Sequence, residues 1–529
     1  MNALDEFEQR TTPALLRRNA DRFPDKTFLT DQEGSLTYAE MLQLASQVAG
    51  GFQQLGIERG DRVGIMLDNR REFIASWFGL SLLGAVEVPI NPQNVGQRLI
   101  HVLNHSACRV LVVQSDYLPQ LEAVRPSLHV LETVVIVGEP TSSGFELQTW
   151  AGIADAPPAM SLPDVKLSDP AVVMYTSGST GPAKGAVMPF GQHYMNGYQA
   201  VTSARIADDD RLFICIPLHH NMAQGYGVMP ALVAGAAIHL GRPFDRHSFW
   251  DEVAHSGATV LPFVGAMLVL LAKNDPDPQD SRNPLRVGYG VPIPAAVHTA
   301  FENRFDLQLI HCYGSTEATI VAWGGGPGVV PGSVGLPFPG YEIRLVDEQD
   351  LPVPQGQTGQ ICVRSDQPWS MFSGYVNEPE KTARAWLNGW FHTGDRGRFD
   401  ERGSLWFSDR LGDVIRCKGE SVSAHEVEEV FLNHPQVALV AAYGVPNSLG
   451  DEDIVAAILA VDGARLLPHE LYEWSLGRLP RYALPRYVEL VDEFPMTATG
   501  KIEKFKLRVS GVAPGAFDAR SELGRGSRS

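Results

Sequence analysis

The sequence predicts an α/β protein with a large N-terminal domain of layered sheets and helices and a small, mobile α+β C-terminal domain. Three observations predict this fold class. The chain has 529 residues, more than one hydrophobic core usually supports. Helix-like and strand-like segments alternate up to about residue 407, and beyond Asp409 a compact run of shorter elements follows. We therefore expect a large domain at 1–409, a small domain at 410–510 and a disordered tail at 511–529.

The first segments have clear periodicities. Apolar residues recur every three or four positions from Tyr38 and stop at Gly56, which predicts an amphipathic helix with a glycine stop. An apolar strand follows at 62–67, then a helix at 73–83 and a strand at 86–90. This β–α–β order favours a largely parallel sheet.

The second half of the chain divides in two. Residues 167–407 repeat the alternation and contain most of the glycine-rich turns, which usually lie at the working edge of a sheet. Beyond them the pattern predicts a helix at 424–433, strands at 437–443 and 454–461, and a helix from Pro468. These elements suit a separate small α+β domain.

Composition narrows the class of partner. The net charge of −18 disfavours binding to nucleic acid and to anionic membrane surfaces. Five cysteines without CxxC pairing argue against a disulfide framework and a cysteine-based zinc site, and favour a reducing, cytoplasmic setting. The N-terminal residues lack the pattern of a signal peptide, and the sequence contains no apolar run long enough for a membrane span. A small-molecule substrate is the favoured partner, and a homodimer is compatible with the sequence.

A loop rich in glycine and hydroxyl groups follows the apolar strand predicted at 171–175. Backbone N–H groups, hydroxyls and the positive charge of Lys184 suit a polyphosphate. The loop differs from a Walker A sequence because Gly185, rather than Ser or Thr, follows Lys184. A flexible linker is the alternative, but a linker would not be bracketed by an apolar strand and a lysine. The candidate phosphate-binding residues are Thr176, Ser177, Gly178, Ser179, Thr180 and Gly181.

This loop and a second segment, 311–317, resemble the adenylate-forming superfamily, which includes acyl-CoA synthetases, peptide-synthetase adenylation domains and firefly-type luciferases. The second segment contains Tyr313-Gly314-Ser315-Thr316-Glu317, similar to the family's Tyr-Gly-x-Thr-Glu signature. The resemblance implies that ATP binds here, with Tyr313 on the adenine, Thr316 at the phosphate and Glu317 holding Mg²⁺. One carboxylate is reasonable for a magnesium nucleotide, since Mg²⁺ uses few protein ligands.

Two further motifs resemble the family's in order and spacing. Thr393-Gly394-Asp395 is followed fifteen residues later by Arg410, and the resemblance implies that Asp395 and Arg410 hold the ribose. A Thr-x-x-Gly-Lys motif ends at Lys501, which would neutralise charge as the carboxylate attacks the α-phosphate. Standing alone, Asp395 would be interpreted as a turn aspartate, and Arg410 or Lys501 as a surface cation.

Other correspondences are less complete. Residues 288–292 occupy the place of the family's adenine-binding turn, although Tyr289 interrupts the usual paired glycines, and only Gly290 and Val291 are carried over. His220, in His219-His220, resembles the residue that gates the acyl pocket and is counted with Lys184, Glu317 and Lys501 as catalytic. A two-histidine metal site is the alternative, which we set aside because neighbours on a strand point to opposite faces.

The resemblance implies two half-reactions: acyl-adenylate formation from MgATP, then transfer to a thiol, usually coenzyme A, after the small domain rotates. Gly412 stands where the family hinge usually has Asp or Lys. An adenylation-only enzyme that hands acyl-AMP to another protein or carrier therefore stays open as the alternative. A merely nucleotide-binding scaffold is disfavoured by the presence of both Glu317 and Lys501.

The acid itself is predicted only by class. Among subfamilies the chain most resembles coenzyme A ligases of the carnitine and crotonobetaine type, notably through residues 244–250. The pocket candidates are small or apolar and would admit a bulky, largely hydrophobic acid. Those candidates are His220, Val264, Gly265, Gly288 and Trp323.

Overall fold

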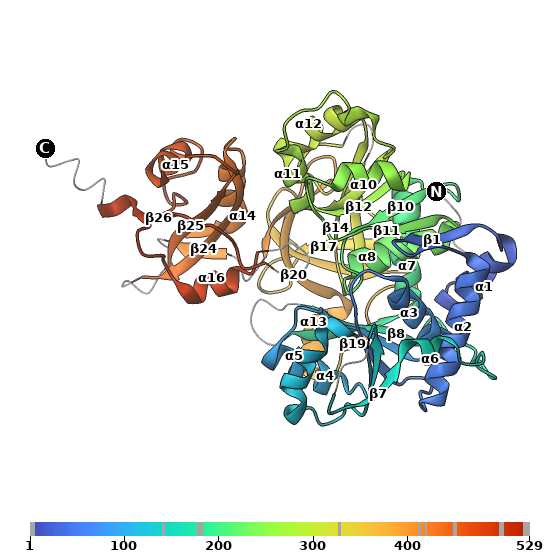
Figure 1. Cartoon of the computed structure of the whole chain (residues 1–529). Helices are drawn as coiled ribbons and strands as arrows, with labels where there is room; N and C mark the ends of the chain where they lie inside the picture. Colours follow the sequence, from blue (N-terminus) through green and yellow to red (C-terminus); the bar gives the residue numbers. More distant parts are fainter. Residues whose placement is uncertain are drawn as a thin grey trace, which may run out of the picture.

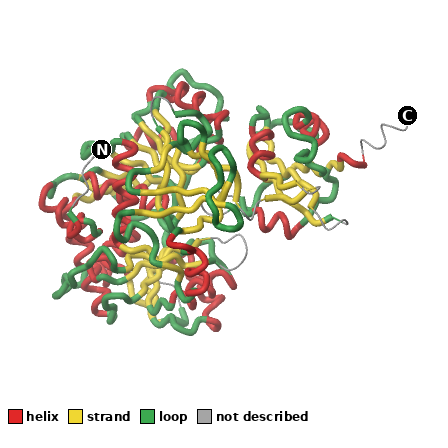
Figure 2. Tube along the Cα trace, turned by 180° about the vertical axis from the view of Figure 1, so that it is seen from behind, coloured by secondary structure: helices red, strands yellow, loops and turns green. Residues whose placement is uncertain are grey.

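The computed structural model describes residues 6–139, 143–176, 183–325, 329–410, 414–417, 420–447, 452–496 and 502–521. Figure 1 shows a large lobe and, beside it, a smaller lobe in orange and red formed by the C-terminal elements. The tube in Figure 2 shows strands inside both lobes, with helices packed around them. The predicted combination of a large N-terminal and a small C-terminal α/β unit is therefore correct.

The first large sheet has nine strands in the order β16-β15-β14-β13-β12-β10-β11-β1-β2. Its centre is parallel, from β1 through β14, and the edge pairs β1–β2, β14–β15 and β15–β16 are antiparallel. The strands are β1 (Thr27–Asp31), β2 (Gly34–Thr37), β10 (Arg211–Ile214), β11 (Ala237–Leu240), β12 (Val260–Val264), β13 (Val287–Val291), β14 (Gln308–Ser315), β15 (Thr319–Gly324) and β16 (Leu336–Pro337).

The second large sheet has eight strands in the order β19-β9-β8-β4-β3-β5-β6-β7 and contains the predicted β–α–β segment. Strands β4, β3, β5, β6 and β7 pair in parallel, as expected. The strands are β3 (Arg62–Met66), β4 (Val86–Pro89), β5 (Val110–Gln114), β6 (Thr133–Val137), β7 (Glu146–Thr149), β8 (Pro170–Thr176), β9 (Lys184–Pro189) and β19 (Gly374–Tyr375).

Two helices without a solvent-exposed face pack in the interior of the large lobe. Helix α3 is buried except at Arg71, and α7 is buried except at Thr202. Their apolar side chains belong to one hydrophobic core that includes residues of both large sheets. The helices of the large lobe are α1 (Thr12–Arg22), α2 (Tyr38–Gln54), α3 (Arg71–Leu83), α4 (Gly96–Ser106), α5 (Leu118–Val124), α6 (Trp150–Ala154), α7 (Phe190–Ala204), α8 (Asn221–Ala223), α9 (Met229–Ala234), α10 (Phe249–Ser256), α11 (Gly265–Ala272), α12 (Ala295–Phe305) and α13 (Pro379–Ala385).

The last part of the large lobe departs from the predicted alternation. Four antiparallel strands form a separate sheet in the order β17-β18-β20-β21. Consecutive antiparallel strands need no crossover helix, so the β–α–β rhythm expected up to residue 407 stops earlier. The strands are β17 (Tyr341–Val346), β18 (Gly359–Ser365), β20 (Phe391–Phe399) and β21 (Leu405–Arg410).

The small lobe has its own core, in which α14 packs on a four-stranded sheet. Its helices and strands include all four predicted segments, each close to its predicted position. They are β22 (Val414–Cys417), β23 (Glu420–Ser423), α14 (Ala424–Leu432), β24 (Val437–Pro446), β25 (Glu452–Ala460), α15 (Pro468–Ser475), β26 (Tyr487–Leu490), α16 (Lys504–Ser510) and β27 (Phe517–Asp518).

The prediction that the tail is disordered from residue 511 is wrong for residues 517–519. Phe517 and Asp518 pair with Val488 and Tyr487 of β26, and Ala519 is buried. An ion pair between Arg486 and Asp518 adds to this contact. A glycine- and serine-rich composition hid the strand, because two paired residues leave no periodicity to detect. The limit at 409/410 between the two domains stays a prediction.

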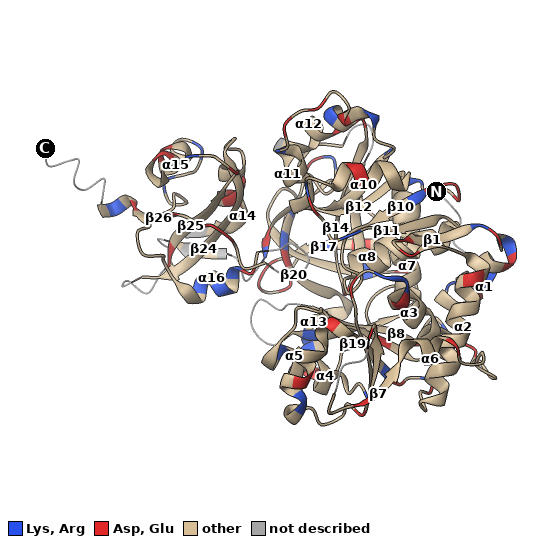
Figure 3. Cartoon of the chain, in the orientation of Figure 1, with Lys and Arg blue, Asp and Glu red and all other residues tan. Residues whose placement is uncertain are grey.

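Charges of both signs are interspersed over the two lobes in the view of Figure 3. None of the described helices combines the length and apolar character that crossing a bilayer requires.

Two glycines of β13 give a stability prediction. A Cβ on Gly290 would lie 2.1 Å from the Phe263 carbonyl oxygen, whereas one on Gly288 would meet only side chains, at 3.3 Å. Gly290→Ala should therefore destabilise the large lobe by about 1–3 kcal/mol, because a backbone atom cannot move aside. Gly288→Ala, the matched control, should have a smaller effect. Urea unfolding followed by tryptophan fluorescence measures both, and equal midpoints for the two variants would contradict the prediction.

Candidate functional site

The candidate residues gather at the carboxyl ends of the parallel strands in the nine-stranded sheet. Strands β10, β12, β13 and β14 run parallel, so their carboxyl ends meet at one edge of the sheet, which is where open α/β sheets bind ligands. The segments that follow or end these strands hold the predicted residues. They are His220 after β10, Val264 and Gly265 at the end of β12, Gly290 and Val291 in β13, and Tyr313 and Gly314 in β14.

The phosphate loop connects two antiparallel strands. Thr176, the last residue of β8, pairs directly with Lys184, the first residue of β9. A strand rather than a helix follows this loop, so no helix dipole assists phosphate binding as it does in a Walker A loop. The predicted residues Ser177, Gly178, Ser179, Thr180 and Gly181 lie outside the described residues.

Tyr375 brings Lys184 and Glu317 together. The Lys184 Nζ lies 5.1 Å from the centre of the Tyr375 ring, within the range of a cation–π contact. The Tyr375 hydroxyl donates a hydrogen bond to Glu317 Oε1 at 2.9 Å. Burial, and then the neighbouring Glu317 carboxylate, raise the pKa of Tyr375, so its hydroxyl stays a donor. The loop lysine and the candidate metal ligand therefore share one neighbour.

Glu317 fits the requirements of a Mg²⁺ ligand. Its side chain is half-buried at the strand-end edge, and the one hydrogen bond described for the carboxylate uses Oε1. Mg²⁺ in nucleotide sites is commonly bound by one or two carboxylates together with phosphate oxygens and water. A carboxylate beside the phosphate loop therefore suits this ion.

Side chains of α7 hold the backbone of the Thr316–Glu317 segment by hydrogen bonds. Gln192 Nε2 donates to the Thr316 carbonyl at 2.7 Å and to the Glu317 carbonyl at 3.2 Å. Two turns further along the same face of α7, the Gln199 side chain accepts a hydrogen bond from the Ile320 N–H at 3.1 Å. Both glutamines are fully buried. The turn that presents Glu317 is thus fixed by two side chains of an interior helix.

Asp395 is the centre of a second cluster. The Tyr313 hydroxyl donates to Asp395 Oδ2 at 2.9 Å, and Arg410 Nε lies 3.1 Å from Oδ1. The fifteen-residue spacing of the sequence becomes a direct cross-strand pair, because Asp395 of β20 lies opposite Arg410 of β21. Burial, and then the charge of Asp395, raise the pKa of Tyr313. The cluster offers a buried carboxylate with an aromatic ring and a cation beside it.

Several glycines at the site are required by packing. A Cβ on Gly314 would lie 2.0 Å from the Thr319 carbonyl oxygen, and one on Gly265 would lie 2.2 Å from the Pro292 carbonyl oxygen. Gly288 faces the side chains of Leu309 and Phe263. The structure therefore gives close backbone approach as the reason for Gly314 and Gly265. That Gly265 and Gly288 line an acyl pocket stays a prediction.

His219 and His220 do not lie on a strand, so the geometric reason given for setting aside a metal site is wrong. Both follow β10 in a turn, and their ring centres are 4.2 Å apart. Burial lowers the pKa of His219 to about 3, which keeps that ring neutral. In the described part of the chain these two rings are not grouped with a third metal-ligating residue.

Lys501 lies outside the described residues, but both sides of its segment are placed. Met496 and Ile502 form an isolated antiparallel bridge, and the Glu503 N–H donates to the Pro495 carbonyl at 2.7 Å. The described residues on the two sides of Lys501 therefore lie next to each other.

Comparison with known proteins covers both lobes. A family described as "AMP-binding enzyme" matches residues 16–376, and one described as "AMP-binding enzyme C-terminal domain" matches 426–501. The chain belongs to the AMP-binding enzyme family. A crotonobetaine/carnitine–CoA ligase of Salmonella paratyphi A is 31% identical over 501 residues, 92% of this chain and 97% of the relative.

Solved structures of family members resemble the whole AMP-binding enzyme. The anthranilate CoA ligase AuaEII, in complex with anthranoyl-AMP, superposes with a TM-score of 0.86 at 27% identity, covering 94% of this chain and 97% of that protein. ATP-bound MatB from Rhodopseudomonas palustris gives 0.83 at 26% identity, covering 94% and 99%. The predicted fold class and the predicted reaction class, acid activation with ATP followed by transfer to coenzyme A, are confirmed. The roles of individual residues stay predictions.

Tyr375 and Gln192 are the residues of this AMP-binding enzyme that sequence reasoning missed. Tyr375 lies in a two-residue strand and Gln192 in a helix buried on all sides, so neither stands in a recognisable motif. The available signal was the spacing of Gln192 and Gln199, seven residues apart and so on one face of a helix, since amides that a helix buries need partners.

Two other polar features lie apart from this edge. Asp350, Cys362 and His392 come within 4.8 Å of one another, but Cys362 Sγ faces His392 Nδ1 and Asp350 faces Nε2. A metal ion binds only one ring nitrogen, so this arrangement is a hydrogen-bonded chain.

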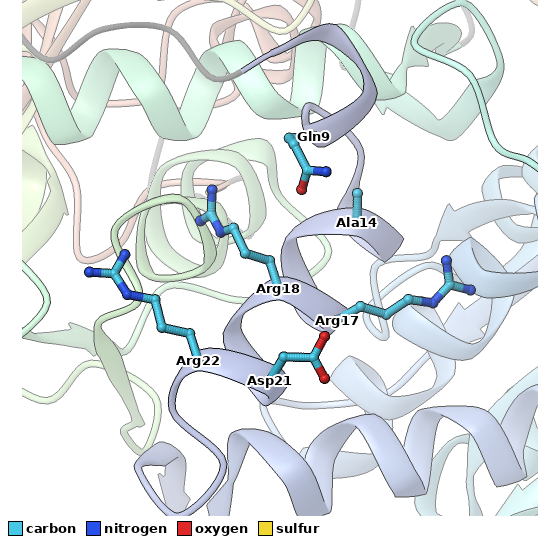
Figure 4. Close-up of a pocket in the computed structure, with 6 residues that line it drawn as sticks. All are labelled: Gln9, Ala14, Arg17, Arg18, Asp21 and Arg22. Carbon is cyan, nitrogen blue, oxygen red and sulfur yellow. The ribbon is translucent and has the colours of Figure 1, made fainter.

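A surface cavity at α1 is lined by Arg17, Arg18, Asp21 and Arg22, together with Gln9 and Ala14 (Figure 4). Arg18 donates to the carbonyls of Leu232 and Val233, at 3.1 and 2.9 Å, near the end of α9. Arginine at the last carbonyls of a helix stabilises that helix, which explains its presence without a ligand.

Removal of the Tyr313 hydroxyl tests the Asp395 cluster. Tyr313→Phe should weaken ATP binding about tenfold, because the Asp395 carboxylate loses a charge-assisted donor that orients it. Tyr341→Phe removes an equally buried hydroxyl, which contacts Thr319 and Ser370 instead. Isothermal titration with ATP measures both. An unchanged affinity in Tyr313→Phe, or an equal loss in the control, would show that the cluster does not serve the nucleotide.

Proposed function

We propose that the protein is an AMP-forming acid:coenzyme A ligase whose acid is bulky and largely hydrophobic. The observation that carries the site assignment is the meeting of Lys184 and Glu317 at Tyr375. These residues belong to motifs 133 positions apart, on two different sheets, yet both contact one side chain. A cation from a phosphate loop beside a free carboxylate oxygen is the arrangement that a magnesium nucleotide needs.

In the first half-reaction the acid's carboxylate oxygen attacks the α-phosphorus of ATP. A carboxylate-oxygen-to-phosphorus bond forms, the bond from the α-phosphorus to the bridging oxygen breaks, and pyrophosphate leaves. Lys184 lies at the base of the loop that receives the β- and γ-phosphates, and Asp395 with Arg410 orients the ribose. Lys501 supplies positive charge at the reacting groups, so that catalysis consists of positioning and charge stabilisation.

Glu317 would hold Mg²⁺, which neutralises phosphate charge when bound. In the second half-reaction the thiol sulfur of coenzyme A attacks the acyl carbonyl, the acyl–oxygen bond to AMP breaks, and the thiol proton is lost to solvent or base.

The acid class rests on apolar surface at the strand-end edge. Val264 and Trp323 are half-buried there, so part of each apolar side chain stays available to a ligand. The relatives named for anthranilate and for carnitine represent two types of acid, an aromatic acid and a quaternary ammonium acid. We assign this chain to the first kind.

ATP–pyrophosphate exchange over a panel of acids tests this assignment. We expect the fastest acid-dependent exchange with aromatic or branched hydrophobic carboxylates, and little with carnitine-like acids, because the pocket offers apolar contact rather than a counter-charge. A preference for the quaternary ammonium acids would overturn the acid class while leaving the ligase assignment intact. The same panel contains short aliphatic acids as size controls.

An adenylation-only enzyme is the second candidate, motivated by Gly412 at the hinge, a position outside the described residues. The two candidates separate when the best acid, MgATP and saturating coenzyme A are supplied together. We expect acyl-CoA and AMP in equal amounts. Accumulation of acyl-AMP without acyl-CoA would favour the second candidate.

Lys501→Ala should lower acid-dependent pyrophosphate release by at least two orders of magnitude, the size typical for loss of one preorganised charge-stabilising group. The thermal midpoint should not change, because we assign the Lys501 side chain to catalysis rather than to packing. Lys381→Ala is the control, because Lys381 forms a surface ion pair with Glu378. Pyrophosphate release near the wild-type rate in Lys501→Ala would refute the assigned role.

The use of Mg²⁺, a cytoplasmic location and a homodimer belong to this proposal as well. They are supported by the fit of Glu317, by the scattered buried cysteines and by the class of the relatives.

A further inference from the structure

Helix α4 presents one polar face to the phosphate loop. Arg98, His101 and His105 are spaced three and four residues apart, so their side chains lie on the same side of the helix. The other side carries buried apolar residues that pack on the eight-stranded sheet. Helix α4 is thus fixed to the large lobe, and its polar face is free to contact other segments.

Two of these side chains hold the two ends of the phosphate loop. His105 Nδ1 lies 2.8 Å from the hydroxyl of Tyr175, directly before Thr176. His101 Nε2 lies 2.9 Å from the carbonyl oxygen of Ala183, directly before Lys184. The two imidazole rings stack, with centres 5.0 Å apart. The loop therefore starts and ends against one helix.

The third side chain reaches the small lobe. Arg98 Nη1 forms an ion pair with Glu503 Oε1 at 3.4 Å. Glu503 is fixed within the small lobe, because its N–H donates to Pro495 and its carboxylate also pairs with Lys506. Lys501 precedes Glu503 by two residues, which limits its Cα to about 7 Å from that of Glu503. A residue that fixes Glu503 therefore restricts where Lys501 can lie.

We propose that α4 is a positioning element for the adenylation half-reaction, in which Arg98, through Glu503, aligns the Lys501 segment with the phosphate loop held by His101 and His105. This inference rests on the proposed function. It adds a positioning residue that belongs to none of the sequence motifs. Arg98 acts through Glu503 and touches none of the reacting groups.

The ion pair between Arg98 and Glu503 is weak enough to form and break as the small lobe moves. The Arg98 side chain is 44% exposed and that of Glu503 16%, so the ion pair is partly screened by solvent. A second ion pair between the lobes, Arg246 with Asp462, involves the other end of the large lobe. Among the described ion pairs these two join the lobes, and only that of Arg98 adjoins the lysine segment. A weak pair can favour one orientation without preventing the small lobe from leaving it.

Charge variants of the pair test the proposal in the two half-reactions separately. Arg98→Ala should slow acid-dependent ATP–pyrophosphate exchange about three- to fivefold, the effect of losing one partly exposed ion pair. Arg98→Glu should slow it about tenfold, because like charges then face each other. The double variant Arg98→Glu/Glu503→Arg should recover most of the rate. Thioester formation from supplied acyl-AMP and coenzyme A should be unchanged in all of them.

Arg364→Ala is the matched control, since Arg364 and Glu342 form an exposed ion pair within one sheet, and it should leave both half-reactions unchanged. Full exchange activity in Arg98→Glu, equal losses in both half-reactions, or no recovery in the double variant would overturn the inference.

A measurement without substrate separates this inference from the proposed function. The five native cysteines are buried, so spin labels can be placed on cysteines introduced at exposed Glu132 and Glu470. Arg98→Glu should broaden the distance distribution between the lobes, and the double variant should narrow it again. An unchanged distribution would overturn the inference even if the ligase activity were established, and a broadened one would support it even if no acid were found.

Discussion

The hydrogen bond from the Tyr375 hydroxyl to the Glu317 carboxylate is the interaction on which the candidate site depends. Tyr375 belongs to the edge of the eight-stranded sheet, and Glu317 follows a strand of the nine-stranded sheet. The same tyrosine ring lies under the Lys184 ammonium. A partly buried hydrogen bond to a carboxylate is stronger than a neutral one, so this contact fixes the distance between the candidate phosphate loop and the candidate metal ligand, which belong to separate sheets.

Two helices fix the rest of the site through hydrogen bonds from their polar side chains. Gln192 of α7 holds the backbone that presents Glu317, and α4 holds both ends of the phosphate loop through His101 and His105. Each of these helices is anchored by apolar burial on its sheet and uses a few polar side chains to fix a neighbouring loop. This division explains how loops rich in glycine and serine can act at defined positions, since their own sequence provides little rigidity.

The two lobes have different physical requirements. The main core of the large lobe includes residues of both large sheets, and glycines such as Gly290 and Gly314 admit backbone contacts that no side chain could fit. The small lobe has a separate core, and the ion pairs that join it to the large lobe are at the surface. Salt and water weaken such pairs, so the relative orientation of the lobes is held far more weakly than either interior. This difference suits the rotation of the small lobe that the family resemblance implies between the two half-reactions.

The sequence by itself determined the periodic elements, the two-lobed α/β class and the ordered motifs that contain Lys184, Glu317, Asp395 and Arg410, because these depend on local spacing and residue type. Only the tertiary structure decided that Tyr375 and Gln192 contact those motifs, that Arg98 pairs with Glu503, that β17, β18, β20 and β21 form an antiparallel sheet, and that Phe517 pairs with the small lobe's sheet. Contacts between distant segments depend on how strands are ordered in a sheet, and no local pattern encodes that order. Asp395 and Arg410 show the limit between the two, since their spacing was visible in the sequence but their ion pair required a hairpin in the correct register.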